Sequence, residues 1–207
     1  MRNISTYISE KLKISSGKQT HNFVPENKFE LMSRLKELIK KRGYDADLND
    51  IDTSKIDDLS SVFFVVGGSR LGKIDISDWD VSNVRYMSSV FFGCSKFNSD
   101  LSRWNVSNVI DMNNMFCNCY KFNSDLSEWN VSKVRNMSGT FYYCYDFNSD
   151  ISEWDVSKVE NMTGMFYECK KFNQDLSEWD VSNVTKMYKM FHNCESLENI
   201  PDWYNTK

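Results

Sequence analysis

The apolar residues of this chain recur with a fixed period of 25 residues. Tryptophan opens five successive periods: Trp79, Trp104, Trp129, Trp154 and Trp179. Phenylalanine follows twelve residues after each of them: Phe91, Phe116, Phe141, Phe166 and Phe191. A sixth, degenerate copy, Ile51 to Phe63, precedes these five. Because nine of the 25 positions in a typical copy are apolar, one copy cannot close a core alone and must bury its face against its neighbours.

Two spacings of apolar residues alternate within each copy. Trp129 and Val131 are two residues apart, which places both side chains on one face of a short strand at about residues 128–132. Val134, Met137 and Phe141 then step by three and four, which is typical of a helical or 3-10 segment. The sequence therefore predicts an α/β repeat: a leucine-rich-repeat-like solenoid of six turns, with one short parallel strand and one helical or 3-10 return per turn.

The residues that flank the repeats predict caps. Apolar residues spaced by three and four predict a short amphipathic helix within residues 1–14, and a polar connector follows over 15–26. Asn27 and Glu30 form a capping-box pattern and Gly43 is a stop signal, so a helix is predicted from Lys28 to Arg42. We interpret residues 1–50 as an N-terminal helical cap and connector, 51–203 as the solenoid and 204–207 as a C-terminal tail. The alternative for the helix is a basic surface that binds a membrane or a partner.

The repeat resembles a known family. Its pattern W-[DN]-V-S-[NK]-V-x-x-M-x-x-M-F-x-x-C-x-x-F-N-x-D-L-S is similar to the 25-residue repeat class of BspA-like leucine-rich repeat surface proteins. The residues that match lie across two adjacent copies: Met115, Phe116, Cys119, Phe122, Leu126, Trp129 and Val131. The resemblance covers about residues 51–203. It implies an open right-handed solenoid with a parallel sheet along one side, a role in binding host or matrix proteins, and no catalytic residue set.

Charge and hydropathy argue against nucleic-acid binding and against a membrane-spanning helix. The net charge is −4, divided into +3 for residues 1–50 and −7 for residues 51–207, so a basic nucleic-acid footprint is absent. No apolar run approaches the roughly 18 residues that a membrane-spanning helix needs. No secretory or lipoprotein signal is visible, so the chain as written is expected in the cytoplasm, and at the cell surface if the family resemblance holds.

Polar residues flank each tryptophan of the predicted strand. The position before it holds Asp78, Arg103, Glu128, Glu153 and Glu178. The position after it holds Asp80, Asn105, Asn130, Asp155 and Asp180. Together they predict an acidic ribbon on the exposed strand face, which would recognise a basic or polar patch of a protein partner. The alternative is a solvated face that only keeps the sheet soluble.

Other columns have structural interpretations. The tryptophans and methionines are predicted core. Serines two residues after the Asp/Asn position are predicted to cap the return helix. Aspartates of the FNxDLS segment, with their neighbouring asparagines, are predicted to stabilise a turn; calcium binding is the competing hypothesis. Trp203 and Tyr204 are predicted to cover the last turn.

Cysteine and histidine usage argues against catalysis and metal binding. Five of the six cysteines share one repeat position and are predicted to be buried and reduced: Cys94, Cys119, Cys144, Cys169 and Cys194. Cys117 is predicted to be an exposed thiol. The only histidines, His21 and His192, belong to no spaced ligand set. We therefore expect no metal, no cofactor and no enzyme activity, but a protein-interaction module of adhesin-like or scaffold type; the alternative is a self-associating structural component of a cell envelope or particle.

Overall fold

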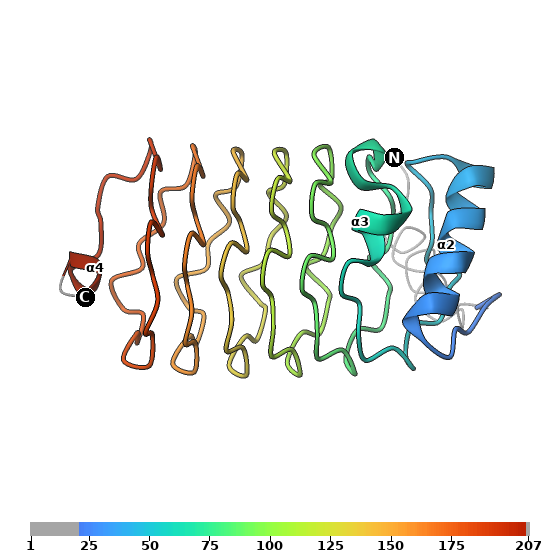
Figure 1. The fold of residues 1–207 in the computed structure, drawn as a ribbon, viewed down its shortest axis with the longest axis horizontal. Coiled ribbons are helices and arrows are strands. Elements are labelled where there is room, and N and C mark those ends of the chain that lie inside the picture. Colours follow the sequence, from blue (N-terminus) through green and yellow to red (C-terminus); the bar gives the residue numbers. More distant parts are fainter. Residues whose placement is uncertain (1–20, 206–207) are drawn as a thin grey trace, which may run out of the picture.

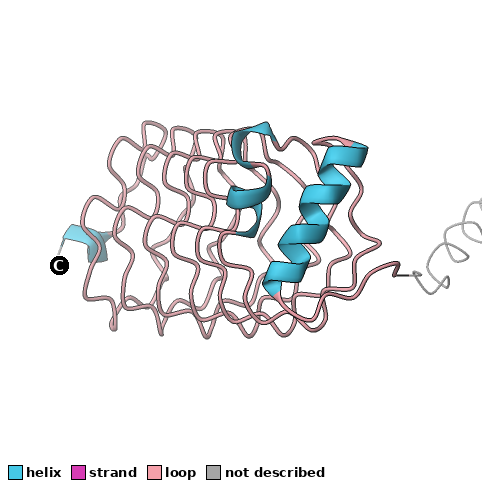
Figure 2. Ribbon diagram, turned by 45° about the vertical axis from the view of Figure 1, so that its right-hand side comes forward, coloured by secondary structure: helices cyan, strands magenta, loops and turns pink. Residues whose placement is uncertain are grey.

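The chain winds into a row of stacked coils. The computed structural model describes residues 21–205. Helix α2 (Lys28–Arg42) covers one end of the row, and the short helix α4 (Asp202–Asn205) lies at the other end (Figure 1). Between them, regular structure in the described part of the chain is confined to helix α3 (Val62–Val66) and the 3-10 helix η1 (Gly68–Arg70). The coils themselves consist of tight turns, drawn as loops in Figure 2.

The predicted α/β repeat with one strand per turn is wrong. Within residues 21–205, neighbouring coils are joined by isolated parallel bridges and not by a sheet. The bridges lie at the position before the methionine column: Tyr86, Asp111, Asn136, Asn161 and Lys186. The Trp-x-Val segment forms a tight turn instead, in which the Val134 N–H donates to the Val131 carbonyl over 2.8 Å. A turn of this kind also sends two apolar side chains to one side, which explains why the spacing resembled a strand.

The predicted helical return is also wrong. Its backbone bonds run from residue i to i−3 and do not propagate, as in Tyr142 N to Gly139 O (3.0 Å) and Cys144 N to Phe141 O (2.9 Å). Two residues in each coil have left-handed φ angles, for example Gly139 at 61° and Tyr143 at 59°. Neither a right-handed helix nor a strand can continue through such residues. The apolar spacing of three and four therefore reflects consecutive turns.

A row of backbone donors holds successive coils together. In the coil that begins at Trp104, the N–H groups of Met112, Asn114, Phe116 and Asn118 donate to carbonyls of the next coil over 2.7–2.9 Å. The same four bonds recur at every interface from residues 87–93 to residues 162–168. We call this row of four N–H groups the donor ladder. All of its donors point towards the C-terminal end of the stack.

The interior consists of columns of identical side chains. The buried Phe141 ring stacks on Phe116 and Phe166 in the flanking coils at 5.7 Å, and on Phe147 within its own coil at 3.9 Å. The indole N–H of Trp129 donates to the Leu101 carbonyl of the previous coil over 3.0 Å. The prediction that the tryptophans belong to the core is confirmed, because Trp79, Trp104, Trp129, Trp154 and Trp179 are at most 4% exposed. Four of the five column methionines are fully buried, and Met187 is partly buried.

The cysteine column is reduced, as predicted. All six thiols are free, and the Cys144 Sγ donates to the Phe116 carbonyl over 3.0 Å. The same bond recurs for Cys119, Cys169 and Cys194. The prediction of an exposed Cys117 is wrong, since it is 6% exposed. The polar neighbours of Cys117 in sequence did not reveal this burial.

The predicted helix at Lys28–Arg42 is confirmed as α2. Asn27 Oδ1 accepts from the N–H groups of Phe29 (3.0 Å) and Glu30 (3.1 Å), and the Glu30 carboxylate accepts from Glu26 N (3.0 Å). Gly43, at φ 93°, ends the helix. Its apolar residues are buried: Leu31, Leu35, Leu38 and Ile39. The helix packs against α3 over the first coil (Figure 2), and this burial favours the cap over a free basic helix.

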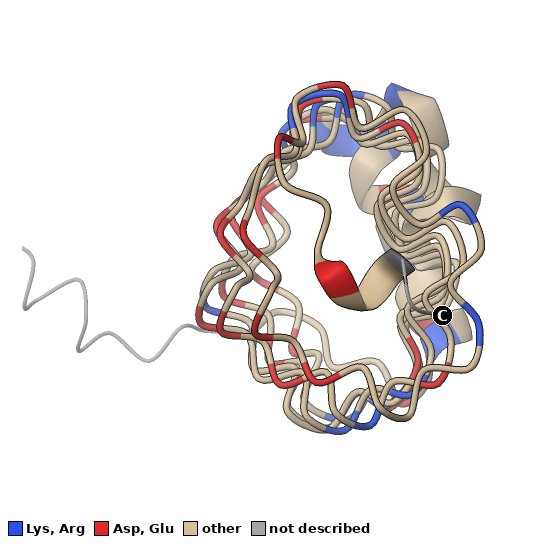
Figure 3. Cartoon of the chain, turned by 90° about the vertical axis from the view of Figure 1, so that its left-hand side faces the viewer, with Lys and Arg blue, Asp and Glu red and all other residues tan. Residues whose placement is uncertain are grey.

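The two ends of the stack are built differently. At the first end, the degenerate copy joins the stack through the bridge from Asp58 to Tyr86 and the stacking of Phe63 on Phe91 at 5.1 Å. At the other end, α4 lies across the opening of the last coil (Figure 3). There the Tyr204 ring meets Phe191 edge-on at 5.1 Å, as the predicted covering of the last turn requires. The helix predicted within residues 1–14 lies outside the described residues.

Candidate protein-binding face

The ten residues predicted to form a binding ribbon occupy two positions of the repeat, so they lie on one side of the stack. Figure 3 shows acidic residues in rows along the coils. All ten are exposed, and each flanks a buried tryptophan. Their backbone is a series of turns and not a strand, so we call this surface the acidic face. It comprises Asp78, Asp80, Arg103, Asn105, Glu128, Asn130, Glu153, Asp155, Glu178 and Asp180.

The position after each tryptophan serves the fold. Asp80 Oδ1 accepts from the Ser82 N–H over 2.9 Å, and Asn130 Oδ1 from the Ser132 N–H over 3.1 Å. Asn105, Asp155 and Asp180 make the same bond. These side chains close a local turn, so one side-chain oxygen of each already accepts a hydrogen bond within the fold. The predicted role of the serines as helix caps is wrong, because the serine contributes its backbone N–H and no helix follows.

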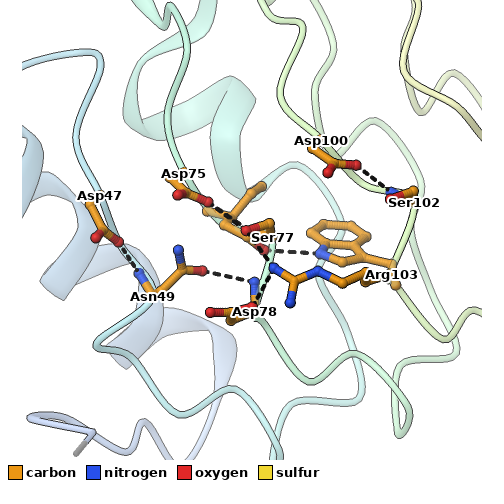
Figure 4. Close-up of polar contacts among 10 residues, drawn as sticks. Asp47, Asn49, Asp75, Ser77, Asp78, Asp100, Ser102 and Arg103 are labelled. Atoms are coloured by element: carbon orange, nitrogen blue, oxygen red, sulfur yellow. Dashed lines mark hydrogen bonds and ion pairs between the residues drawn. The ribbon is translucent and has the colours of Figure 1, made fainter. Parts of the chain in front are cut away.

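Of the five residues that precede the tryptophans, two form an ion pair with each other and three form none within the described residues. Figure 4 shows the ion pair: the Arg103 guanidinium lies 2.5 Å from the Asp78 carboxylate and donates to Ser77 Oγ over 3.1 Å. The Asp78 N–H is itself held by Asn49 Oδ1 at 2.9 Å. Arg103 therefore neutralises the N-terminal end of the acidic face.

Glu128, Glu153 and Glu178 are the three that form no such pair. Their side chains are exposed, and no hydrogen bond or ion pair within residues 21–205 holds them. They occupy one repeat position in three consecutive coils, and the spacing of hydrogen-bonded parallel backbones is about 4.8 Å. Three like charges in a row on one side of the stack produce a local negative potential, which attracts cations.

The FNxDLS aspartates stabilise turns, as predicted. Asp100 Oδ1 accepts from the Ser102 N–H over 2.9 Å (Figure 4), and Asp125, Asp150 and Asp175 accept from the equivalent serines. The neighbouring asparagines bond between coils, as in Asn148 N to Asn123 Oδ1 at 2.7 Å. Within the described residues, no group of three or more His, Cys, Asp or Glu side chains could hold a metal ion.

A comparison with known families supports the repeat character of the chain. The family model described as "Mycoplasma protein of unknown function, DUF285" matches residues 32–142 and 124–207. The chain belongs to this family. Membership fits the resemblance to BspA-like surface repeat proteins loosely, without identifying the specific repeat motif. No curated protein and no solved structure matches the chain. No helix within residues 21–205 of this DUF285 protein is long and apolar enough to cross a membrane.

An aromatic surface of this DUF285 protein was not predicted. Tyr142 stacks on Tyr167 at 4.5 Å, Tyr167 on His192 at 4.8 Å, and Tyr120 on Tyr145 at 4.9 Å. These residues lie one and four positions after the buried phenylalanine, so reading those two columns would have found them. Burial raises the pKa of Tyr142. The rings stack on one another and thus already use much of their contact area within the fold.

The turn-closing aspartates make stability depend on pH. Hydrogen bonds from Ser102 lower the pKa of Asp100, and bonds from the equivalent serines lower the pKa of Asp125, Asp150 and Asp175. A carboxylate with a lowered folded-state pKa stabilises the fold above its unfolded pKa of about 3.9. That contribution is lost as the pH falls through the folded-state pKa.

Replacing these four aspartates with asparagine is expected to flatten the pH dependence of stability below about pH 4. Asparagine preserves the acceptor, as Asn105 and Asn130 show in equivalent turns. The Tm of wild type and variant would be compared by circular dichroism at about pH 7 and about pH 3, with a smaller fall in the variant. Glu128→Gln, Glu153→Gln, Glu178→Gln is the control, since these carboxylates accept no bond. Identical pH profiles for wild type and the asparagine variant would contradict the prediction.

Proposed function

We propose that this chain is a non-enzymatic protein-interaction module, adhesin-like or scaffold-like, that binds a basic patch of a protein partner through the acidic face. The observation that supports this proposal is the row of exposed, unpaired carboxylates at Glu128, Glu153 and Glu178. Unpaired like charges on a surface repel each other, and a partner that brings Lys or Arg side chains relieves that repulsion while it binds.

The rigidity of the coils favours binding through this face. Each of the three glutamates immediately precedes a tryptophan that is buried and hydrogen-bonded to the previous coil. The backbone that carries the charges is therefore fixed before a partner arrives, so little conformational entropy is lost on binding. Exposed charges of this kind mainly accelerate association and set specificity, and their effect weakens as salt concentration rises.

The chemistry of the thiols favours a non-enzymatic role. Burial raises the pKa of Cys94 and Cys117 to about 12 and that of Cys119 well above its ordinary value. The thiolate is the nucleophilic form of cysteine, so these side chains are almost entirely unreactive at neutral pH. His192 lies in the aromatic column against Tyr167 and forms no pair with a nucleophile.

A self-associating component of a cell envelope or particle is the second candidate. The stack favours this reading through its repetitive sides, which could align with those of another copy. The coverage of the first coil by α2 opposes direct end-to-end continuation of the core. The specific BspA-like repeat class, and with it display at the cell surface, belongs to this proposal as an analogy with the family.

Reversing three charges tests the proposal. The variant Glu128→Lys, Glu153→Lys, Glu178→Lys is expected to lose a partner that wild type captures from lysate and surroundings of the source organism. With the captured protein purified, affinity measured by biolayer interferometry should fall on the order of tenfold or more. The loss should shrink as salt is added.

A matched control separates the acidic face from net charge. Glu37→Lys, Glu160→Lys, Glu195→Lys makes the same change in net charge at residues outside the acidic face, where each glutamate forms an ion pair. This control variant should still bind the captured partner with the affinity of the wild type. Equal loss in both variants would refute a specific site. Recovery of the chain alone, equally by wild type and by the acidic-face variant, would favour the structural candidate.

A further inference from the structure

In the last coil, the donor ladder has no acceptor within residues 21–205. At each interface from residues 87–93 to residues 162–168, four N–H groups of one coil donate to carbonyls of the next coil, as Met162, Gly164, Phe166 and Glu168 do to the last coil. The corresponding donors of that last coil are Met187, Lys189, Phe191 and Asn193. None of these four N–H groups donates to an acceptor within residues 21–205.

The end of the described chain covers the core but not the ladder. The indole of Trp203 donates to the Leu176 carbonyl over 2.9 Å, and both Trp203 and Tyr204 pack on Phe191. Figure 3 shows α4 inside the outline of the coils. The apolar interior is thus shielded, while the row of backbone donors on the wall remains open.

The hollow beside the open ladder is lined by cationic side chains, and within residues 21–205 the one carboxylate bonded to a residue of the open ladder is that of Glu168, which accepts from the Asn193 side chain. A hollow of about 980 Å³ lies at this end, and its lining includes Lys186, Lys189 and His192 but no aspartate or glutamate. Backbone N–H groups aligned in turns with alternating right-handed and left-handed residues carry partial positive charge and attract anions. Lys189 itself has a left-handed φ of 54°. The backbone N–H groups and the lysine side chains therefore both favour an anionic ligand.

We propose that this end of the stack binds an extended, acidic segment of a partner protein. Backbone carbonyls of the segment accept from the four open donors, as carbonyls of the next coil do elsewhere, and its carboxylates meet Lys186 and Lys189. Addition of an extended segment to an open backbone edge is a common mode of peptide recognition. The inference is separate from the acidic face, which selects a basic partner.

A second copy of the chain fits this end poorly. Two such ends facing each other would oppose donors with donors and lysines with lysines. The opposite end of the stack is covered by α2, whose last turn is basic at Lys40, Lys41 and Arg42. The charge pattern therefore favours a different, acidic occupant.

A labelled peptide tests the proposal on the full chain. The probe is a short synthetic peptide that alternates glutamate with valine, and glutamine replaces glutamate in the control peptide. Fluorescence anisotropy should show saturable binding of the acidic peptide and much weaker binding of the glutamine peptide. Amide exchange measured by NMR should slow at Met187, Lys189, Phe191 and Asn193.

Variants taken from the chain's own repeats keep the fold intact. Lys186→Asn, Lys189→Gly installs the residues found at the same repeat positions in Asn136, Asn161, Gly139 and Gly164. Lys133→Asn, Lys158→Asn removes the same charge elsewhere, with residues found at Asn83 and Asn108. Affinity for the acidic peptide should fall about tenfold in the first variant and less than about twofold in the second.

Three results would overturn the inference. These are equal loss of affinity in both lysine variants, equal binding of the glutamine peptide, and unchanged exchange of the four amides in the presence of bound peptide. The acidic-face variant should still bind the acidic peptide, so failure of this site and failure of the proposed function are distinguishable.

Discussion

Replacing Phe141 with alanine is expected to lower the free energy of unfolding by about 3–5 kcal/mol, the largest effect of any substitution considered for this chain. The side chain is fully buried and stacks on phenylalanines of the coils before and after it. In a stacked repeat, each coil contacts only the coil before it and the coil after it. Removal of the Phe141 ring therefore removes a main apolar contact at both of these interfaces. Urea denaturation followed by circular dichroism measures the loss.

Phe191→Ala is the matched control for this prediction. Phe191 occupies the same repeat position in the last coil, where it stacks on Phe166 but has α4 in place of a further coil. It is also 7% exposed, whereas Phe141 is completely buried. The loss of stability should be clearly smaller than for Phe141→Ala. Equal losses would show that stability does not follow nearest-neighbour packing in this stack.

Replacing Gly164 with valine is expected to cost about 2–3 kcal/mol, the second largest effect. Gly164 has a left-handed φ of 61°, which a β-branched residue adopts only under strain. A Cβ atom at this position would also lie 3.2 Å from Tyr142 Cδ2. The strain would weaken the donor ladder here, where the Gly164 N–H donates to the Tyr188 carbonyl over 3.0 Å. Thermal and urea denaturation measure the cost.

The reverse substitution in the next coil provides the comparison. Lys189 occupies the repeat position of Gly164 and has a φ of 54°. Lys189→Gly relieves strain in the folded state but gives the unfolded chain more freedom, so stability should change by less than about 1 kcal/mol. A large loss in this variant would show that the side chain at this position, and not the backbone angle, decides stability.

The exposure of the acidic face could be predicted from the sequence, but the structural role of half of its residues could not. The acidic column before the tryptophans was correctly expected to be exposed, because it flanks residues that must be buried. The column after the tryptophans has similar composition, yet Asp80, Asn105 and Asp155 each close a turn. The two roles differ in whether a backbone N–H group lies within reach of the side-chain oxygen, and this depends on how the chain turns after the tryptophan.

The sequence by itself determined the 25-residue period, the buried columns and the N-terminal helix with its caps. Burial of repeated apolar residues and helix capping depend on residue type and spacing along the chain. Only the tertiary structure decided that coils join through isolated bridges and turns, because apolar spacing is the same in a strand and in a turn that bonds to its neighbours. It also decided that, among the described residues, the ladder donors of Met187, Lys189, Phe191 and Asn193 have no acceptor. A backbone N–H group is the same in every residue except proline, so its partner depends on what lies beside it.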